Sequence, residues 1–142
     1  DQGRAAVVET AGNHNCHIIL RGGTSGPNWD EESLNDAEAR LNKAEQTVSI
    51  MVDASHANSG KSEVRQAEVV EELGKLIGGG DERITGIMME SFLEAGAQKI
   101  TDGRKGLVYG KSVTDACMDW ETTDRLLRTL AAEVRKRRQA RD

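Results

Sequence analysis

The chain has 142 residues, of which 37% are hydrophobic and 30% are charged, and its formal net charge at pH 7 is −5. This length can bury the core of one domain, no apolar run approaches membrane-spanning length, and the acidic balance argues against general affinity for nucleic acid. We therefore expect no membrane and no nucleic-acid partner. The two cysteines, Cys16 and Cys117, lie far apart in the sequence, which suits a reducing compartment and predicts a cytoplasmic protein.

Four short apolar segments have the length of β-strands. They are bounded by Gly, Asn or Asp and span residues 5–10, 16–21, 47–53 and 84–89. A loop of turn residues at 11–15 separates the first two segments, and this spacing predicts a β-hairpin. The last three segments are apolar throughout rather than alternating, which is typical of parallel strands covered by helices.

A segment with helical periodicity follows each of the last three strands. Residues that can cap these helices are Asn28 or Asp30, Ser59 or Ser62, and Thr114 or Asp115. The predicted inward faces carry Leu34, Ala37, Leu41 and Ala44, then Val64, Ala67, Val70, Leu73 and Ile77, then Trp120, Leu127, Leu130, Ala131 and Val134. The glycines at 78–80 predict the end of the second helix. Residues 92–113 lack periodicity, which is typical of a functional loop or of disorder.

Three βα units in series predict a parallel α/β sheet. Three strands cannot close a barrel, and such a sheet leaves two strand edges unpaired. We therefore expect the chain to be a piece of something larger. An alternative is a homo-oligomer in which the strand edges pair between copies.

Polar residues follow the predicted strands at the ends where α/β folds place their chemistry. His56, Glu90 and Asp115 come from three successive elements, and a histidine with two carboxylates suits Mn²⁺, Fe²⁺, Co²⁺ or Zn²⁺. Each of these residues alone is more often a cap or an ion-pair partner, so the hypothesis depends on their convergence. Arg21, followed by two glycines, suits a phosphate or carboxylate ligand, and an ion pair at a barrel rim is an equal alternative.

Several ordered motifs resemble signatures of one enzyme family. They are CHIILRGG at 16–23, LNKA at 41–44, DASHANS at 53–59, MES at 89–91 and YGKSVTDAC at 109–117. In this order and spacing they resemble class I 3-deoxy-D-arabino-heptulosonate 7-phosphate (DAHP) synthases. The resemblance extends over nearly all of the chain.

The resemblance implies the C-terminal part of a (β/α)8 TIM barrel, with residues 1–15 in part of an inserted hairpin and 16–142 in barrel strands six to eight with their helices. It implies condensation of phosphoenolpyruvate (PEP) with erythrose 4-phosphate, the first step of the shikimate pathway, with a divalent metal. By the same resemblance His56, Glu90 and Asp115 are metal ligands, Asp115 also contacts the aldose, and Arg21 binds the PEP phosphate. Catalytic roles accordingly fall on Arg21, His56 and Asp115.

Some parts of the family pattern are missing from this sequence. The fourth metal ligand of the family is a cysteine, which neither Cys16 nor Cys117 matches, and further substrate-binding Lys and Arg segments are also absent. We therefore expect the chain alone to be inactive. Its expected partner is the N-terminal part of the same enzyme, which in full-length form is expected to be a homo-oligomer. The alternative is a truncated homologue that serves as a non-catalytic binding or regulatory module.

Overall fold

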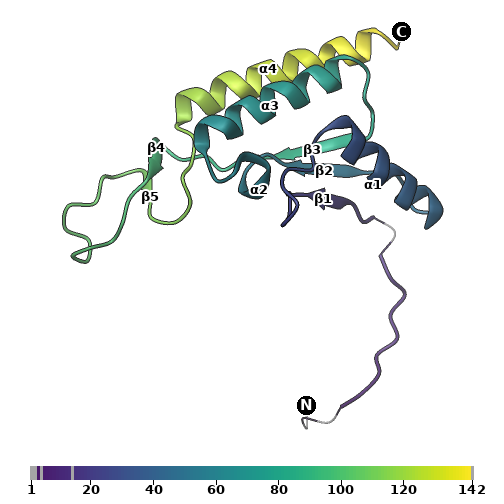
Figure 1. Ribbon diagram of the computed structural model, residues 1–142, viewed down its shortest axis with the longest axis horizontal. Helices are drawn as coiled ribbons and strands as arrows, with labels where there is room; N and C mark the ends of the chain where they lie inside the picture. Colours follow the sequence, from purple (N-terminus) through teal and green to yellow (C-terminus); the bar gives the residue numbers. More distant parts are fainter. Residues whose placement is uncertain (1–2, 4, 14, 142) are drawn as a thin grey trace.

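The computed structural model describes residues 3, 5–13 and 15–141, and a parallel sheet lies at its centre (Figure 1). The strands are β1 (Ile18–Leu20), β2 (Ile50–Asp53) and β3 (Ile84–Met88), in the order β1-β2-β3. Ile18 pairs with Ile50, and Ile50 pairs with Ile84. The predicted parallel α/β sheet is confirmed, and the carboxyl ends of all three strands meet at one edge.

Three long helices accompany the sheet, each with an acidic or hydroxyl cap. They are α1 (Glu31–Lys43), α3 (Glu63–Gly78) and α4 (Trp120–Gln139), and a short helix, α2 (His56–Ser59), precedes α3. Asp30 and Ser62 cap α1 and α3 by accepting from the backbone N–H three residues later, as the sequence predicts. The predicted end of α3 is also confirmed, because the helix ends at Gly78.

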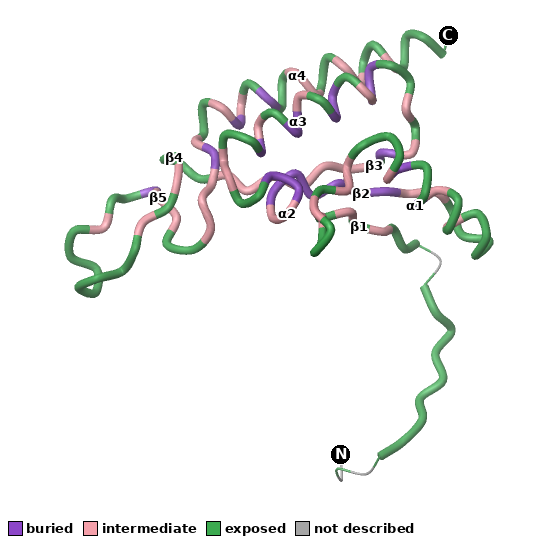
Figure 2. Tube along the Cα trace, in the orientation of Figure 1, coloured by how far each residue is buried: buried purple, intermediate pink, exposed green. Residues whose placement is uncertain are grey.

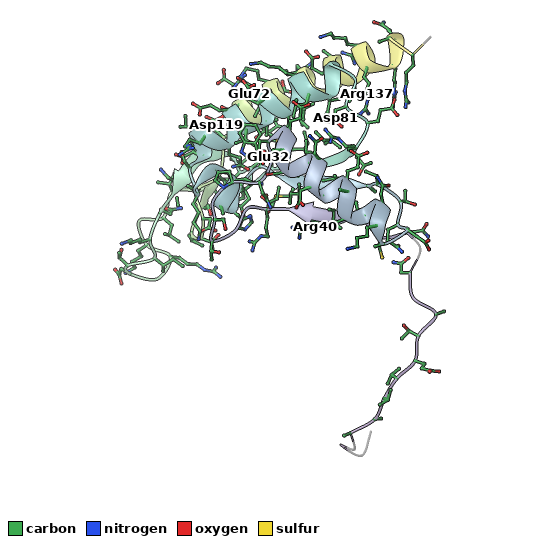
Figure 3. All side chains as sticks on the ribbon, turned by 45° about the vertical axis from the view of Figure 1, so that its right-hand side comes forward. Glu32, Arg40, Glu72, Asp81, Asp119 and Arg137 are labelled. Atoms are coloured by element: carbon green, nitrogen blue, oxygen red, sulfur yellow. The ribbon has the colours of Figure 1, made fainter. Side chains whose placement is uncertain are left out.

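Helices α3 and α4 lie side by side over the sheet (Figure 1). At their close approach, a Cβ added at Gly78 would collide with the end of the Glu133 side chain, so a larger residue there requires that side chain to move. Near the far end of α4, Arg137 donates to the carbonyl oxygen of Asp81 at 2.7 Å, which ties the helix to the turn before β3 (Figure 3). No helix among the described residues is long and apolar enough to cross a membrane.

The hydrophobic core lies between the sheet and these helices (Figure 2). Its largest fully buried apolar side chains are Leu34, Ile50, Val52, Val70, Leu73, Met118 and Leu126. Each of the three strands β1, β2 and β3 and each long helix contributes to the core cluster or packs against it. The core therefore fixes where each strand ends. The polar side chains that follow β1, β2 and β3 are held at the carboxyl edge of the sheet, called the rim below.

The last helix begins later than predicted. Asp119 caps α4 by accepting from the N–H of Thr122 at 2.7 Å, so neither Thr114 nor Asp115 opens it. Met118 instead forms a parallel bridge to Ser91, just beyond β3. Asp115 therefore lies before the helix, in the segment that leads to the pairing of Met118 with Ser91. The helical periodicity of the sequence places the start of the helix too early.

The predicted loop at 92–113 contains structure of its own. It includes β4 (Glu94–Ala97) and β5 (Lys111–Ser112), which pair in parallel as a small separate sheet. The Gln98 side chain joins the two ends of the segment between β4 and β5, because its Nε2 donates to the carbonyl oxygens of Val108 and Lys111. Strands of two to four residues are too short to show a period in sequence.

The predicted hairpin of 5–10 with 16–21 does not form. Residues 5–10 contain no strand, and Val7 and Val8 are 96% and 78% exposed. A two-stranded hairpin is marginal without a surface that covers it, and β1 pairs in parallel with β2. Within the predicted range 1–15, residues 1, 2, 4 and 14 lie outside the described part of the chain.

Five residues predicted on inward faces are exposed. The large ones are Val64 by 64%, Trp120 by 57% and Leu127 by 46%, and the small ones are Ala44 and Ala131. Val64 and Trp120 stand in the first turns of their helices, before the buried stripe begins. In α3 that stripe begins at Gln66, a polar residue that is fully buried. The predicted periodicity is correct over most of α1 and α3. In α4 it is also wrong beyond the first turn, because Leu126 is fully buried while Leu127 and Ala131 are exposed.

Candidate metal centre

The side chains proposed from the sequence lie along the carboxyl edge of the sheet. Arg21 follows β1, and His56 lies three residues beyond the end of β2. Glu90 lies two residues beyond β3, and its carbonyl oxygen accepts from the N–H of Met118 at 3.0 Å. Because Asp115 lies three residues before Met118, this pairing brings it to the same edge.

His56, Glu90 and Asp115 converge there. Each offers one ligand atom, and these atoms all lie within 4.8 Å of one another. All three residues are half-buried, so the cluster is open to solvent on one side. The predicted convergence on which the metal hypothesis depends is present in the structure, and neither Cys16 nor Cys117 belongs to the group.

The imidazole of His56 is oriented by Asp53, the last residue of β2. Its Nδ1 lies 2.7 Å from Asp53 Oδ2, which leaves Nε2 as the nitrogen that can bind a metal ion. The His56 backbone adopts φ +44°, a conformation that costs energy for a non-glycine residue. Backbone strain of this kind is found at functional sites where the surrounding structure maintains it.

Glu90 is fixed through both its side chain and its backbone. Its Oε2 accepts from Ser55 Oγ at 2.6 Å. The buried Gln66 side chain accepts from the Glu90 N–H at 2.5 Å and donates to its carbonyl oxygen at 3.3 Å. Helix α3 therefore positions the Glu90 backbone while the β2–α2 turn positions its carboxylate.

Asp115 has a cation beside it and a thiol nearby. Lys61 Nζ lies 3.3 Å from Asp115 Oδ1 and is mostly exposed. Burial raises the pKa of the Cys117 thiol, the negative charges of Glu90 and Asp115 raise it further, and a hydrogen bond with Ser112 opposes them. Burial and, to a lesser extent, the charges of the two carboxylates therefore disfavour the thiolate.

Arg21 stands beside the cluster. Its Nε lies 3.9 Å from Asp53 Oδ2, while its side chain is 59% exposed. The ion pair considered from the sequence is thus present, and the guanidinium still faces solvent on its other sides. Gly22, with φ +74°, passes so close to α2 that an added Cβ would lie 2.7 Å from Ala57 Cβ.

Asn58 joins the ends of two strands to the β1–α1 loop. Its side chain is buried, and its Nδ2 donates to the carbonyl oxygens of Leu20 at 3.1 Å and Asp53 at 2.8 Å. Its Oδ1 accepts from the N–H of Asn28 at 2.8 Å, and Asn28 Oδ1 accepts from the N–H of Gly22 at 2.7 Å. One side-chain amide therefore fixes the backbone at the ends of β1 and β2 and in the β1–α1 loop.

Replacing Asn58 by alanine is expected to lower the free energy of unfolding by about 3 kcal/mol, because one buried and two partly buried backbone groups lose their partner at roughly 1–3 kcal/mol each, with partial rehydration. Denaturant unfolding measures the change. The matched control is Asn42→Ala on the exposed face of α1, for which we expect a change of about 0.5 kcal/mol or less. Equal stabilities of the two variants would show that the Asn58 network contributes nothing.

The donor set fits a divalent transition metal. One imidazole nitrogen and two carboxylate oxygens, each supported by a neighbour, leave open positions for water or a substrate oxygen. The metal ions predicted from the sequence, Mn²⁺, Fe²⁺, Co²⁺ or Zn²⁺, all accept such a set, and nothing in the three ligands selects among them.

Comparison with known proteins adds a family to this geometry. Residues 2–128 match the family described as DAHP synthetase I. The chain belongs to this family. A relative from Corynebacterium glutamicum, named phospho-2-dehydro-3-deoxyheptonate aldolase, is 56% identical over 99% of this chain. The Phe-sensitive aldolase of the same name from Escherichia coli is 46% identical over 96% of it.

A solved structure supports the same relation in three dimensions. The phospho-2-dehydro-3-deoxyheptonate aldolase of Francisella tularensis matches 93% of this chain with a TM-score of 0.86 and 44% identity. The chain spans 38% of that structure and 39% of the Corynebacterium relative. This member of the DAHP synthetase I family therefore corresponds to less than half of the relatives that it resembles.

Several residues that shape the site were assigned no role from the sequence. They are Asp53, Ser55, Asn58, Lys61 and Gln66. A signal was available for Asp53, which ends a buried strand directly before the histidine motif. For Gln66 the helical period placed a polar residue on the inward face, where an amide needs a specific partner that only the folded chain supplies.

Proposed function

We propose that the polypeptide containing this chain condenses PEP with erythrose 4-phosphate and water to give DAHP and phosphate. The observation that carries the proposal is the convergence of His56, Glu90 and Asp115 within 4.8 Å, beside the exposed guanidinium of Arg21. Membership of the DAHP synthetase I family and the names of the relatives support it. In the reaction a carbon–carbon bond forms between the PEP methylene and the aldehyde carbon, and water adds at the PEP-derived carbon that loses phosphate.

Each residue has a role in this proposal. His56, Glu90 and Asp115 hold a divalent metal, which when bound supplies Lewis acidity toward a carbonyl oxygen. Arg21 binds the PEP phosphate through its guanidinium and orients it at the rim. Asp115, with solvent on one side and Lys61 on the other, is placed to accept a hydrogen bond from an aldose hydroxyl.

Residues 16–142 act in this proposal as the C-terminal part of a barrel, and the chain alone is inactive. Two phosphorylated substrates repel each other unless several cations offset their charge. At the rim the described residues provide Arg21 and Lys61, each of which already faces a carboxylate. Further cations and the closing strands come from the rest of a longer polypeptide, which is expected to assemble as a homo-oligomer.

The test uses the polypeptide as its gene encodes it, together with the 142-residue chain expressed alone. We expect the encoded polypeptide to consume PEP and release phosphate only when erythrose 4-phosphate and a divalent metal are both present. The isolated chain is expected to release none. An encoded polypeptide that shows no aldose-dependent loss of PEP with Mn²⁺, Fe²⁺, Co²⁺ or Zn²⁺ contradicts the proposed reaction, and turnover by the isolated chain contradicts its predicted inactivity.

A further inference from the structure

Asp53 is a buried carboxylate at the centre of the rim. It is 3% exposed, and each of its oxygens faces a different group. Oδ1 accepts from the N–H of Ser55 at 2.9 Å, and Oδ2 lies 2.7 Å from His56 Nδ1. The same Oδ2 lies 3.9 Å from Arg21 Nε. A buried charge costs free energy unless such partners offset it, so its position calls for a functional explanation.

We propose that Asp53 is a positioning residue that sets the tautomer of His56. This inference rests on the proposed metal site. A carboxylate that only accepts hydrogen bonds requires the proton of a neutral imidazole on Nδ1, so Nε2 keeps a free lone pair toward Glu90 and Asp115. Asp53 thereby keeps His56 in the form that can bind a metal, and its charge also attracts Arg21 to the same edge.

The geometry predicts what an amide does in its place. In Asp53→Asn one oxygen becomes an NH2 group, and the amide must choose which neighbour that group faces. The N–H of Ser55 is a fixed backbone donor at 2.9 Å, so the remaining oxygen stays with it. The NH2 group then faces His56 Nδ1, which must accept, and the imidazole proton moves to Nε2. Arg21 is mostly exposed and can turn away at little cost.

The tautomer is measured directly by nitrogen-15 NMR of histidine-labelled, metal-free protein, with the His56 signals assigned through a His56→Gln variant. We expect Nδ1–H in the wild type and Nε2–H in Asp53→Asn. A residue with only a structural role would leave the proton where it is. A wild type that already carries Nε2–H overturns the inference, whether or not the variant folds.

Metal affinity, measured by competition with a chelating indicator, provides the second readout. Asp53→Asn is expected to bind Mn²⁺ about 10–100-fold more weakly than the wild type, the usual cost of losing a partner behind a ligand. The matched control is Asp36→Asn, which removes an exposed carboxylate paired with Arg40 on α1 and is expected to bind Mn²⁺ as the wild type does.

The outcomes separate this inference from the function on which it rests. Unchanged affinity and an unchanged tautomer in a folded Asp53→Asn protein overturn the role of Asp53 while leaving the metal site intact. A wild type that binds none of the four metals overturns the proposed site instead. In that case the NMR comparison still decides whether Asp53 determines which nitrogen of His56 carries the proton.

Discussion

Replacing Glu90 by glutamine is expected to lower the affinity of the encoded polypeptide for Mn²⁺ by about 100-fold or more. Losing a partner behind a ligand typically costs 10–100-fold, and here the ligand itself loses its charge. Glutamine preserves the shape of the side chain, and the Gln66 contacts with the Glu90 backbone do not involve the side chain at all. The loss should therefore appear in metal binding rather than in folding.

Activity should fall further, by about a thousandfold, because the Lewis acidity of a bound metal is worth several kcal/mol and each 1.4 kcal/mol is tenfold in rate. The matched control is Glu94→Gln on β4, an exposed carboxylate outside the cluster, which should leave affinity and turnover unchanged. Titration with Mn²⁺ and an assay for PEP consumption measure both effects. If the Glu90 variant binds Mn²⁺ as tightly as the Glu94 control, Glu90 is not a ligand.

Much of this arrangement could be predicted from the sequence because it depends on short patterns. Parallel strands appear as apolar runs. Helix caps such as Asp30 and Ser62 accept a hydrogen bond from the backbone N–H three residues later, which is a fixed spacing in the sequence. Carboxyl ends of parallel strands share an edge, which brings His56 and Glu90 together once the strands are known. Two of the three ligands therefore follow from local patterns and one rule of topology, whereas Asp115 reaches them through the pairing of Met118 beside β3.

The incorrect predictions share a different origin. Val7 and Val8 form an apolar run, but a strand also needs a neighbour and a covered face, and neither can be determined from composition. The predicted helix start near Asp115 extended a helical period backward over residues that instead pair beside β3. The buried amide of Asn58 was missed because its three partners come from three separate segments. Tertiary pairing decided each of these cases.

Gly22→Ala is expected to lower the free energy of unfolding by about 3 kcal/mol. Overpacking costs roughly 1–3 kcal/mol, and a positive φ costs a side chain roughly 1–2 kcal/mol more. Both apply here, because Gly22 has φ +74° and an added Cβ would lie 2.7 Å from Ala57 Cβ and 2.9 Å from Asn58 N. Since Asn58 and Arg21 adjoin this contact, the KM for PEP should rise as well.

Two neighbouring glycines separate the causes. A Cβ on Gly23 meets nothing within 4 Å and carries no positive-φ penalty, so Gly23→Ala should change stability by about 1 kcal/mol or less. Gly26 has φ +110° in open space, so Gly26→Ala measures backbone strain alone. Denaturant unfolding should rank the losses as Gly22, then Gly26, then Gly23. A Gly22 variant no less stable than the Gly26 variant would mean that the contact with α2 does not constrain the rim, and that Arg21 is positioned by other means.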